Sequence, residues 1–204
     1  MPPDQILTPD EALERLKEGN RRFLAGEPAR GIEDPQRRLA LAQAQAPFAV
    51  LVSCSDSRVP PEILFRRGLG ELFIVRNAGN TVDATALGSI EYAVAHLNVP
   101  LVVVMGHQRC GAVAAALAVV CDDTIFPGSL GRMIEPIVPA VLTAQRQPGD
   151  LLDNAVRENV RRVVARLRTA SEPMLLDPLQ AGTLRVVGAR HDLDEGVVEF
   201  FDED

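Results

Sequence analysis

Residues 101–120 read LVVVMGHQRCGAVAAALAVV, an apolar run followed by a polar turn and then by an alanine-rich stretch. Residues 101–104 are short, continuous and β-branched, which is typical of a buried strand. Residues 110–120 have a helical pattern. A buried strand that leads through a short turn into a helix is the building unit of an α/β fold.

Similar units occur elsewhere in the chain. Apolar runs cover residues 48–52, 72–75 and 184–187, and helical patterns are clearest at residues 83–97 and 150–168. Fully apolar strands that alternate with helices form parallel sheets covered on both faces. We therefore predict an α/β fold with a mostly parallel central sheet of about four strands, flanked by helices. Residues 197–201 predict an additional antiparallel edge strand.

The amino-terminal part predicts a helical arm. Thr8-Pro9-Asp10-Glu11 has the pattern of a capping box, which predicts a helix from there to Gly26. Its apolar positions, Leu13 and Leu16 among them, form only part of a stripe, so we expect another surface, such as a second subunit, to cover it.

The chain has no repeat or convincing linker, and its Pro/Gly clusters near residues 126–131 and 147–149 predict loops. We expect one domain over residues 1–204, with the arm at 1–30 and an α/β core at 45–204.

Composition excludes several classes of partner. A net charge of -7 and no basic cluster disfavour nucleic acid and anionic lipid. The longest apolar runs are far shorter than the roughly 20 residues that cross a bilayer, so we expect no membrane span. The first residues lack the features of a signal or transit peptide, so we expect a cytoplasmic protein.

Potential metal ligands follow two of the predicted strands. Cys54 comes directly after the first strand, and His107 and Cys110 follow the third. If these strands are neighbours, the three side chains converge at the carboxyl edge of the sheet, where α/β proteins bind ligands. Two thiolates and one imidazole suit a catalytic zinc ion, which keeps its fourth position open.

Three cysteines are too few, and odd in number, for a disulfide framework, which leaves metal binding, catalysis or burial. Cys121 lies eleven residues after Cys110, roughly 16 Å along a helix, so we expect a buried apolar role for it. No Cys-x-x-Cys pair is present, and no arginine follows Cys54 or Cys110 at the sixth position. Redox and phosphatase chemistry therefore lack their characteristic spacings.

The segments Cys54-Ser55-Asp56-Ser57-Arg58 and His107-Gln108-Arg109-Cys110-Gly111 resemble the paired signature of β-class carbonic anhydrases of the plant-like subgroup. The resemblance extends over roughly residues 45–200. It implies reversible hydration of carbon dioxide to bicarbonate by a zinc-bound hydroxide, with one zinc per chain, and a homodimer or a higher oligomer of dimers.

The resemblance also assigns residues to roles. It implies that Cys54, His107 and Cys110 hold the zinc and that Asp56, paired with Arg58, orients the nucleophile. It further implies that Gln45, Phe73 and Tyr92 line the substrate cleft, where Phe73 and Tyr92 reach the zinc of a partner chain.

Other interpretations stay open at this stage. The same site is compatible with hydrolysis of a carbon dioxide analogue such as carbon disulfide, or with a non-catalytic zinc-binding homologue. Phe73 and Tyr92 are equally typical of core packing. His96 and His191 are candidates for proton shuttling because imidazole titrates near neutrality, although structural roles are commoner for such residues.

Overall fold

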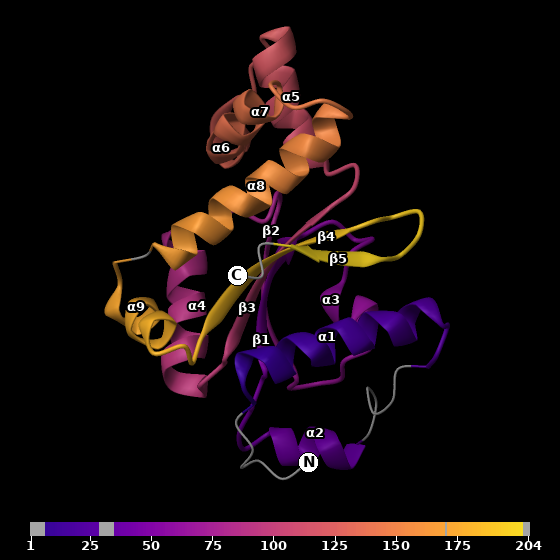
Figure 1. The fold of residues 1–204 in the computed structure, drawn as a ribbon, viewed down its shortest axis with the longest axis vertical. Helices are drawn as coiled ribbons and strands as arrows, with labels where there is room; N and C mark the ends of the chain where they lie inside the picture. Colours follow the sequence, from indigo (N-terminus) through magenta and orange to yellow (C-terminus); the bar gives the residue numbers. More distant parts are fainter. Residues whose placement is uncertain (1–6, 29–34, 170, 202–204) are drawn as a thin grey trace.

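The computed structural model describes residues 7–28, 35–169 and 171–201. Its centre is one sheet in the order β2-β1-β3-β4-β5 (Figure 1). The first four strands in this order are parallel, and β5 runs antiparallel to β4 at the edge, as predicted. The strands are β1 (Ala49–Cys54), β2 (Leu72–Asn77), β3 (Leu101–His107), β4 (Arg185–His191) and β5 (Val198–Phe201).

The long helices lie where the sequence predicts them, and the short helices are additional. The long ones are α1 (Pro9–Leu24), α4 (Ala84–Leu97), α5 (Gly111–Asp122) and α8 (Leu151–Arg168). The short ones are α2 (Pro35–Leu41), α3 (Pro61–Leu64), α6 (Gly128–Ile134), α7 (Val138–Ala144) and α9 (Pro173–Gln180), with a 3-10 turn at Glu135–Ile137.

The loop predicted near residues 126–131 is wrong from Gly128 onward, because α6 begins there. Ile134, the last residue of that helix, is buried in the core and anchors it. The segment at 147–149 is a loop, as predicted.

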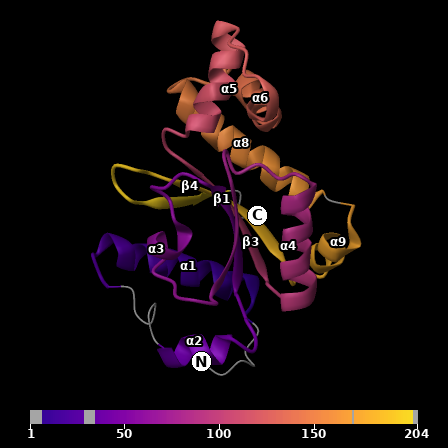
Figure 2. The ribbon, with the colours of Figure 1, turned by 180° about the vertical axis from the view of Figure 1, so that it is seen from behind.

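Helices cover both faces of the sheet (Figures 1 and 2). One face packs on α4, α8 and α9 through valines of alternate positions: Val50, Val52, Val102, Val104 and Val186. The opposite face, which includes Leu51 and Val103, packs on α1 and α3. Successive side chains of a strand point to opposite faces, so a strand covered on both sides must be apolar throughout. This explains the continuous apolar runs.

The amino-terminal arm packs on its own chain. Thr8 caps α1 with the predicted capping box, and the helix buries Leu13 and Leu16 in the core beside α3. Another surface does cover these residues, as expected, but it belongs to the same chain and not to a second subunit. Leu24, at the end of the helix, stays exposed. Residues 1–6 and 29–30 of the expected arm lie outside the described residues.

Helices α5, α6 and α7 form a lobe at one end of the molecule, at the top of Figure 1.

Within the described ranges, no helix is long and apolar enough to cross a membrane. The carboxyl ends of β1 and β3, which pair in parallel, lie beside the start of α5.

Candidate metal centre

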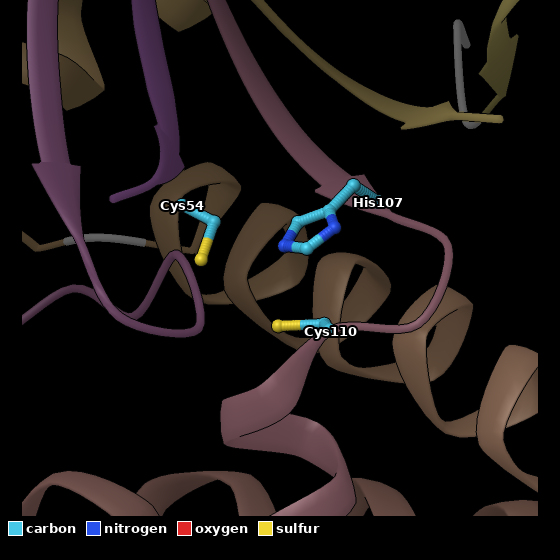
Figure 3. A group of neighbouring side chains, drawn as sticks. All are labelled: Cys54, His107 and Cys110. Atoms are coloured by element: carbon cyan, nitrogen blue, oxygen red, sulfur yellow. The ribbon is translucent and has the colours of Figure 1, made fainter. Parts of the chain in front are cut away.

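Three potential ligands converge where β1 and β3 end. Cys54 is the last residue of β1, His107 is the last residue of β3, and Cys110 is the N-cap of α5. Figure 3 shows their side chains pointing toward one another. Their ligand atoms all lie within 4.8 Å of one another, and all three residues are buried. The predicted convergence is confirmed because β1 and β3 are neighbours.

The hydrogen bonding of His107 prepares it for a metal. Its Nδ1 lies 2.9 Å from the carbonyl oxygen of Gln108, which accepts the ring proton. Nε2 is then an unprotonated acceptor, yet it is buried without a hydrogen-bond partner. A backbone carbonyl that fixes the tautomer in this way is typical of metal-binding histidines.

The separations of the ligand atoms also suit zinc. Two sulfur ligands of a tetrahedral zinc ion, each at about 2.3 Å, would lie about 3.8 Å apart, which is compatible with ligand atoms that all lie within 4.8 Å of one another.

The two thiols interact strongly. The pKa of Cys54 is lowered to about 4, chiefly because the Cys110 thiol donates a hydrogen bond to its sulfur. The same proton, held against the Cys54 thiolate, raises the pKa of Cys110. The backbone N–H groups of Ala112 and Val113 act in the opposite direction on Cys110. A metal ion that takes the place of this shared proton binds both residues as thiolates.

A carboxylate lies beside the cluster. The side chain of Asp56 accepts hydrogen bonds from the Arg58 backbone N–H and Nε at 2.9 Å each and from Nη2 at 2.8 Å. The hydrogen bonds from Arg58 hold the pKa of Asp56 well below its usual range, so the group is ionised near neutrality. Its Oδ2 lies 3.9 Å from Nε2 of His107. The predicted Asp56–Arg58 pair therefore faces the position that a metal ion would take.

Sequence reasoning missed Arg76, which holds the turn between Cys54 and Asp56. Its Nε donates to the carbonyl oxygen of Cys54 at 2.8 Å, and its Nη2 donates to that of Asp56 at 2.7 Å. The available signal was an arginine directly after the apolar run of β2. A cation at the carboxyl end of a parallel strand lies at the ligand-binding edge of the sheet.

The three predicted cleft residues lie close to one another in the structure but away from the metal-ligand cluster of the same chain. They are Gln45, Phe73 and Tyr92. Phe73 pairs with Val50, four residues before Cys54 on β1, which is about 13 Å along the strand. The ring of Tyr92 lies 6.3 Å from that of Phe73. Gln45 and Tyr92 line a surface hollow together with the apolar residues Leu41, Leu69 and Leu97.

The remaining histidines occupy different environments. His191 pairs with His107 across β3 and β4, and its ring nitrogens are buried without partners. Burial, with a smaller contribution from His107, lowers the pKa of His191 to about 4, so it is neutral near pH 7. His96 is exposed, with its ring 5.2 Å from that of Tyr92.

The predicted burial of Cys121 is wrong, because this cysteine is exposed. It lies in the last turn of α5, beyond Ala116, where the helix leaves the core. Its sulfur lies 3.7 Å from Nε2 of Gln145 and plays no part in the cluster.

The fold and the cluster define a metalloenzyme of the zinc type, with three protein ligands at the carboxyl edge of an α/β sheet. The model of the carbonic anhydrase family matches residues 49–198. The chain belongs to this family, in its β class.

Known relatives agree along most of the chain. Carbonic anhydrase 2 of Mycobacterium tuberculosis is 44% identical over 188 residues, covering 92% of this chain and 90% of the relative. The carbonic anhydrase of Mycolicibacterium smegmatis is 42% identical over 191 residues, covering 94% and 92%.

Solved structures agree with the fold as well. A structure of tetrameric β-carbonic anhydrases from Sordaria macrospora superposes with a TM-score of 0.75 at 25% identity, covering 94% of this chain and 98% of the other. The β-carbonic anhydrase CafA of Aspergillus fumigatus gives 0.74 at 28% identity, covering 96% and 91%. The chain is therefore a zinc-dependent lyase that hydrates carbon dioxide reversibly to bicarbonate.

Proposed function

We propose that Cys54, His107 and Cys110 hold the catalytic zinc ion of this carbonic anhydrase. The observation that carries the assignment is the buried, unpartnered Nε2 of His107, which faces two thiols within 4.8 Å. When bound, zinc supplies a Lewis acid that makes a water nucleophile available near neutral pH. The three residues belong to two adjacent strand ends and one helix start, so the sheet positions them before the metal arrives.

Asp56 and Arg58 orient the nucleophile. Asp56 is ionised and lies beside the ligand atoms, so it accepts a hydrogen bond from the attacking water. This bond aligns a lone pair of the water oxygen with the carbon of the substrate. Arg58 occupies both carboxylate oxygens, which fixes the direction of this acceptor. Asp56 stays ionised throughout, so its contribution is alignment and not uptake of the proton.

We propose further that the protein works as a homodimer or a higher oligomer of dimers. Gln45, Phe73 and Tyr92 lie too far along the sheet to serve the cluster of their own chain, and the hollow beside them exposes apolar residues. A second copy seated there would bring Phe73 and Tyr92 to the partner's zinc. Gln45 would then donate its amide hydrogen to a substrate oxygen that gains charge. Tetrameric assembly is described for the Sordaria macrospora relatives.

Two other functions have less support. A non-catalytic zinc module has no need of an ionised carboxylate held 3.9 Å from a ligand atom. Hydrolysis of carbon disulfide uses the same kind of site, but the curated relatives similar to this chain are named carbonic anhydrases. Stopped-flow assays with carbon dioxide and with carbon disulfide separate these possibilities.

We also infer that residues 1–204 form a single domain in the cytoplasm. Burial of Leu13 and Leu16 joins the amino-terminal arm to the core. All three cysteines are unpaired, which suits a reducing compartment.

Metal analysis tests the ligand assignment. Cys54→Ser, His107→Ala and Cys110→Ser should each lose most of their zinc and at least about 100-fold in activity, because each removes one of three ligands. Cys121→Ser is the control and should keep one zinc per chain and full activity, since its side chain lies outside the cluster. If the three ligand variants retain stoichiometric zinc, the assignment is wrong.

A further inference from the structure

We propose that Asn159, on α8, is a positioning residue for the Cys54 thiolate and acts through the peptide backbone of Gly79. The inference rests on the ligand set proposed above and adds a residue that supports one of the ligands without touching it. Helix α8 runs across the molecule from the α5–α7 lobe toward α9 (Figure 1), so its buried face passes close to the ends of the strands.

Two hydrogen bonds connect Asn159 to the sulfur. Nδ2 of Asn159 donates to the carbonyl oxygen of Gly79 at 2.9 Å. The backbone N–H of Gly79 donates to Sγ of Cys54, with 3.4 Å between nitrogen and sulfur. Both contacts are buried. The side chain of Asn159 therefore holds the carbonyl group of Gly79, and the backbone N–H of Gly79 in turn holds the Cys54 sulfur.

Position 79 has no room for a side chain. Gly79 has φ +80°, a conformation that favours glycine. A Cβ there would come within 2.6 Å of Cδ1 of Ile137 and 3.1 Å of Cβ of Ala112. The side-chain amide of Asn77 also closes the loop on Thr81, donating at 2.7 Å and accepting at 2.9 Å. These contacts fix the direction of the Gly79 N–H, so it is pre-organised toward Cys54.

Asn159 is a polar residue on an otherwise apolar face. Its neighbours on the buried side of α8 are Ala155, Val156, Val160 and Val163. Burying an amide among such residues is unfavourable unless the amide is hydrogen-bonded. Since Asn159 is 2% exposed and its amide donates to Gly79, this bond is what accommodates the amide in the core.

The hydrogen bond from Gly79 changes how strongly the Cys54 sulfur donates electrons to a metal ion. An N–H group that donates to a thiolate draws electron density from it and fixes its direction, as second-shell contacts generally do for metal ligands. With the hydrogen bond in place, Cys54 is a weaker electron donor toward the metal than a free thiolate would be. Two thiolates would otherwise make the metal a poorer Lewis acid than a site with three imidazoles.

Cadmium-113 NMR of the otherwise unaltered protein tests the sulfur contact directly. In protein loaded with cadmium-113, we expect a scalar coupling between the metal and the amide proton of Gly79, transmitted across the N–H···S bond. Protein that binds one cadmium through Cys54 but shows no such coupling would overturn the inference alone. Protein that fails to bind cadmium through Cys54 would overturn the ligand set as well.

A pair of variants tests the role of Asn159. Asn159→Leu keeps the approximate size of the side chain but removes the donor. We expect zinc affinity about 10–100-fold weaker, because the loss of a fixed direction for the Cys54 thiolate outweighs its stronger electron donation; competition with a chelator measures this affinity. In the cobalt-substituted protein, we expect the thiolate-to-cobalt absorption band to move to longer wavelength, because a thiolate without its hydrogen bond holds its electrons less tightly.

Asn20→Leu is the matched control. Asn20 is also buried, and it donates to Gly196 and accepts from Val198 on the opposite side of the sheet. It should lose stability yet keep the wild-type cobalt spectrum and zinc affinity. If Asn159→Leu keeps both wild-type properties, or if Asn20→Leu changes them equally, Asn159 is only structural. If Asn159→Leu does not fold, Asn159→Ala, which also removes the donor, takes its place in both measurements.

Discussion

Asp56, beside the metal centre, is held through both its side chain and its backbone. Three hydrogen bonds from Arg58 hold its carboxylate, and Arg76 holds its backbone carbonyl. The guanidinium of Arg58 is itself largely exposed, so the pair contributes little to folding stability. In the function proposed above its contribution is directional, so its removal should change the rate of the reaction more than the free energy of unfolding.

Arg58→Ala should lower kcat/KM about 10–100-fold while zinc content stays at one per chain, because the carboxylate loses its orientation and the metal keeps its ligands. The pKa of Asp56 should rise toward its ordinary value of about 3.9, since the hydrogen bonds that lower it are removed. Stopped-flow kinetics measures kcat/KM, and metal analysis measures the zinc content.

Arg21→Ala is a suitable control for this variant, because Arg21 is an exposed arginine paired with Glu18 on α1. It should leave kcat/KM unchanged. Full activity in Arg58→Ala would show that Asp56 needs no partner to be aligned.

At the scale of elements, α1 is part of the monomer core. Leu16 is fully buried beside residues of α3 and of the sheet. Leu16→Ala should lower the free energy of unfolding by about 2–5 kcal/mol, because it leaves a cavity in a packed core. Urea unfolding measures this value. Leu24→Ala, at the exposed end of the same helix, should have a clearly smaller effect. Equal effects would mean that the arm is not packed on the core in solution.

The edge strand β5 is tied to α8 by charge. Arg157 donates to both carboxylate oxygens of Glu199, at 3.1 and 2.7 Å, and also to Asp153 at 3.1 Å. Arg190, which lies one residue before His191 on β4, donates to the other oxygen of Asp153 at 2.5 Å. This network joins α8 to the two strands at that edge of the sheet.

Glu199→Gln tests the network through pH. Arg157 lowers the pKa of Glu199, so the pair's stabilisation is complete above the unfolded pKa of about 4.3 and is lost as the pH falls through the lower folded pKa. Because Glu199 is half exposed, the variant should lose only about 0.2–1 kcal/mol at pH 7. The difference from wild type should shrink below about pH 4. A constant difference across that range, measured by urea unfolding, would contradict this role.

At the scale of the whole molecule, the dimer proposed above is what completes the site. Leu69 is exposed in the hollow that Gln45 and Tyr92 line. Leu69→Asp should raise the dimer dissociation constant at least about 100-fold, because a charge that replaces an apolar contact at an interface loses its hydration at a cost of several kcal/mol. Activity should fall with the dimer, while zinc is retained. Sedimentation velocity and metal analysis measure the two effects.

Ile125→Asp provides the matched control for the assembly. Ile125 is 88% exposed after α5 and lies outside the hollow. The variant should keep both the oligomeric state and the activity of the wild type. A fully active monomer of Leu69→Asp would refute a cleft shared between chains.

The sequence alone predicted the features that depend on neighbouring residues. The apolar runs predicted the strands because a strand covered on both faces has no polar side to show. Cys54 and His107 followed two of these runs within three residues, and Cys110 stood at the start of a helical pattern, so their place at the carboxyl edge followed from the order of elements. The capping box at Thr8 is equally local, and the structure confirms it.

Only the tertiary structure decided the features that depend on residues far apart in the chain. The burial of Leu16 by its own chain, the exposure of Cys121 and the start of α6 within a Pro/Gly cluster all depend on which surfaces meet. The bond from Asn159 to Gly79 joins residues 80 positions apart. A periodic pattern shows that a face is buried but not what buries it, because packing partners are chosen by the whole fold.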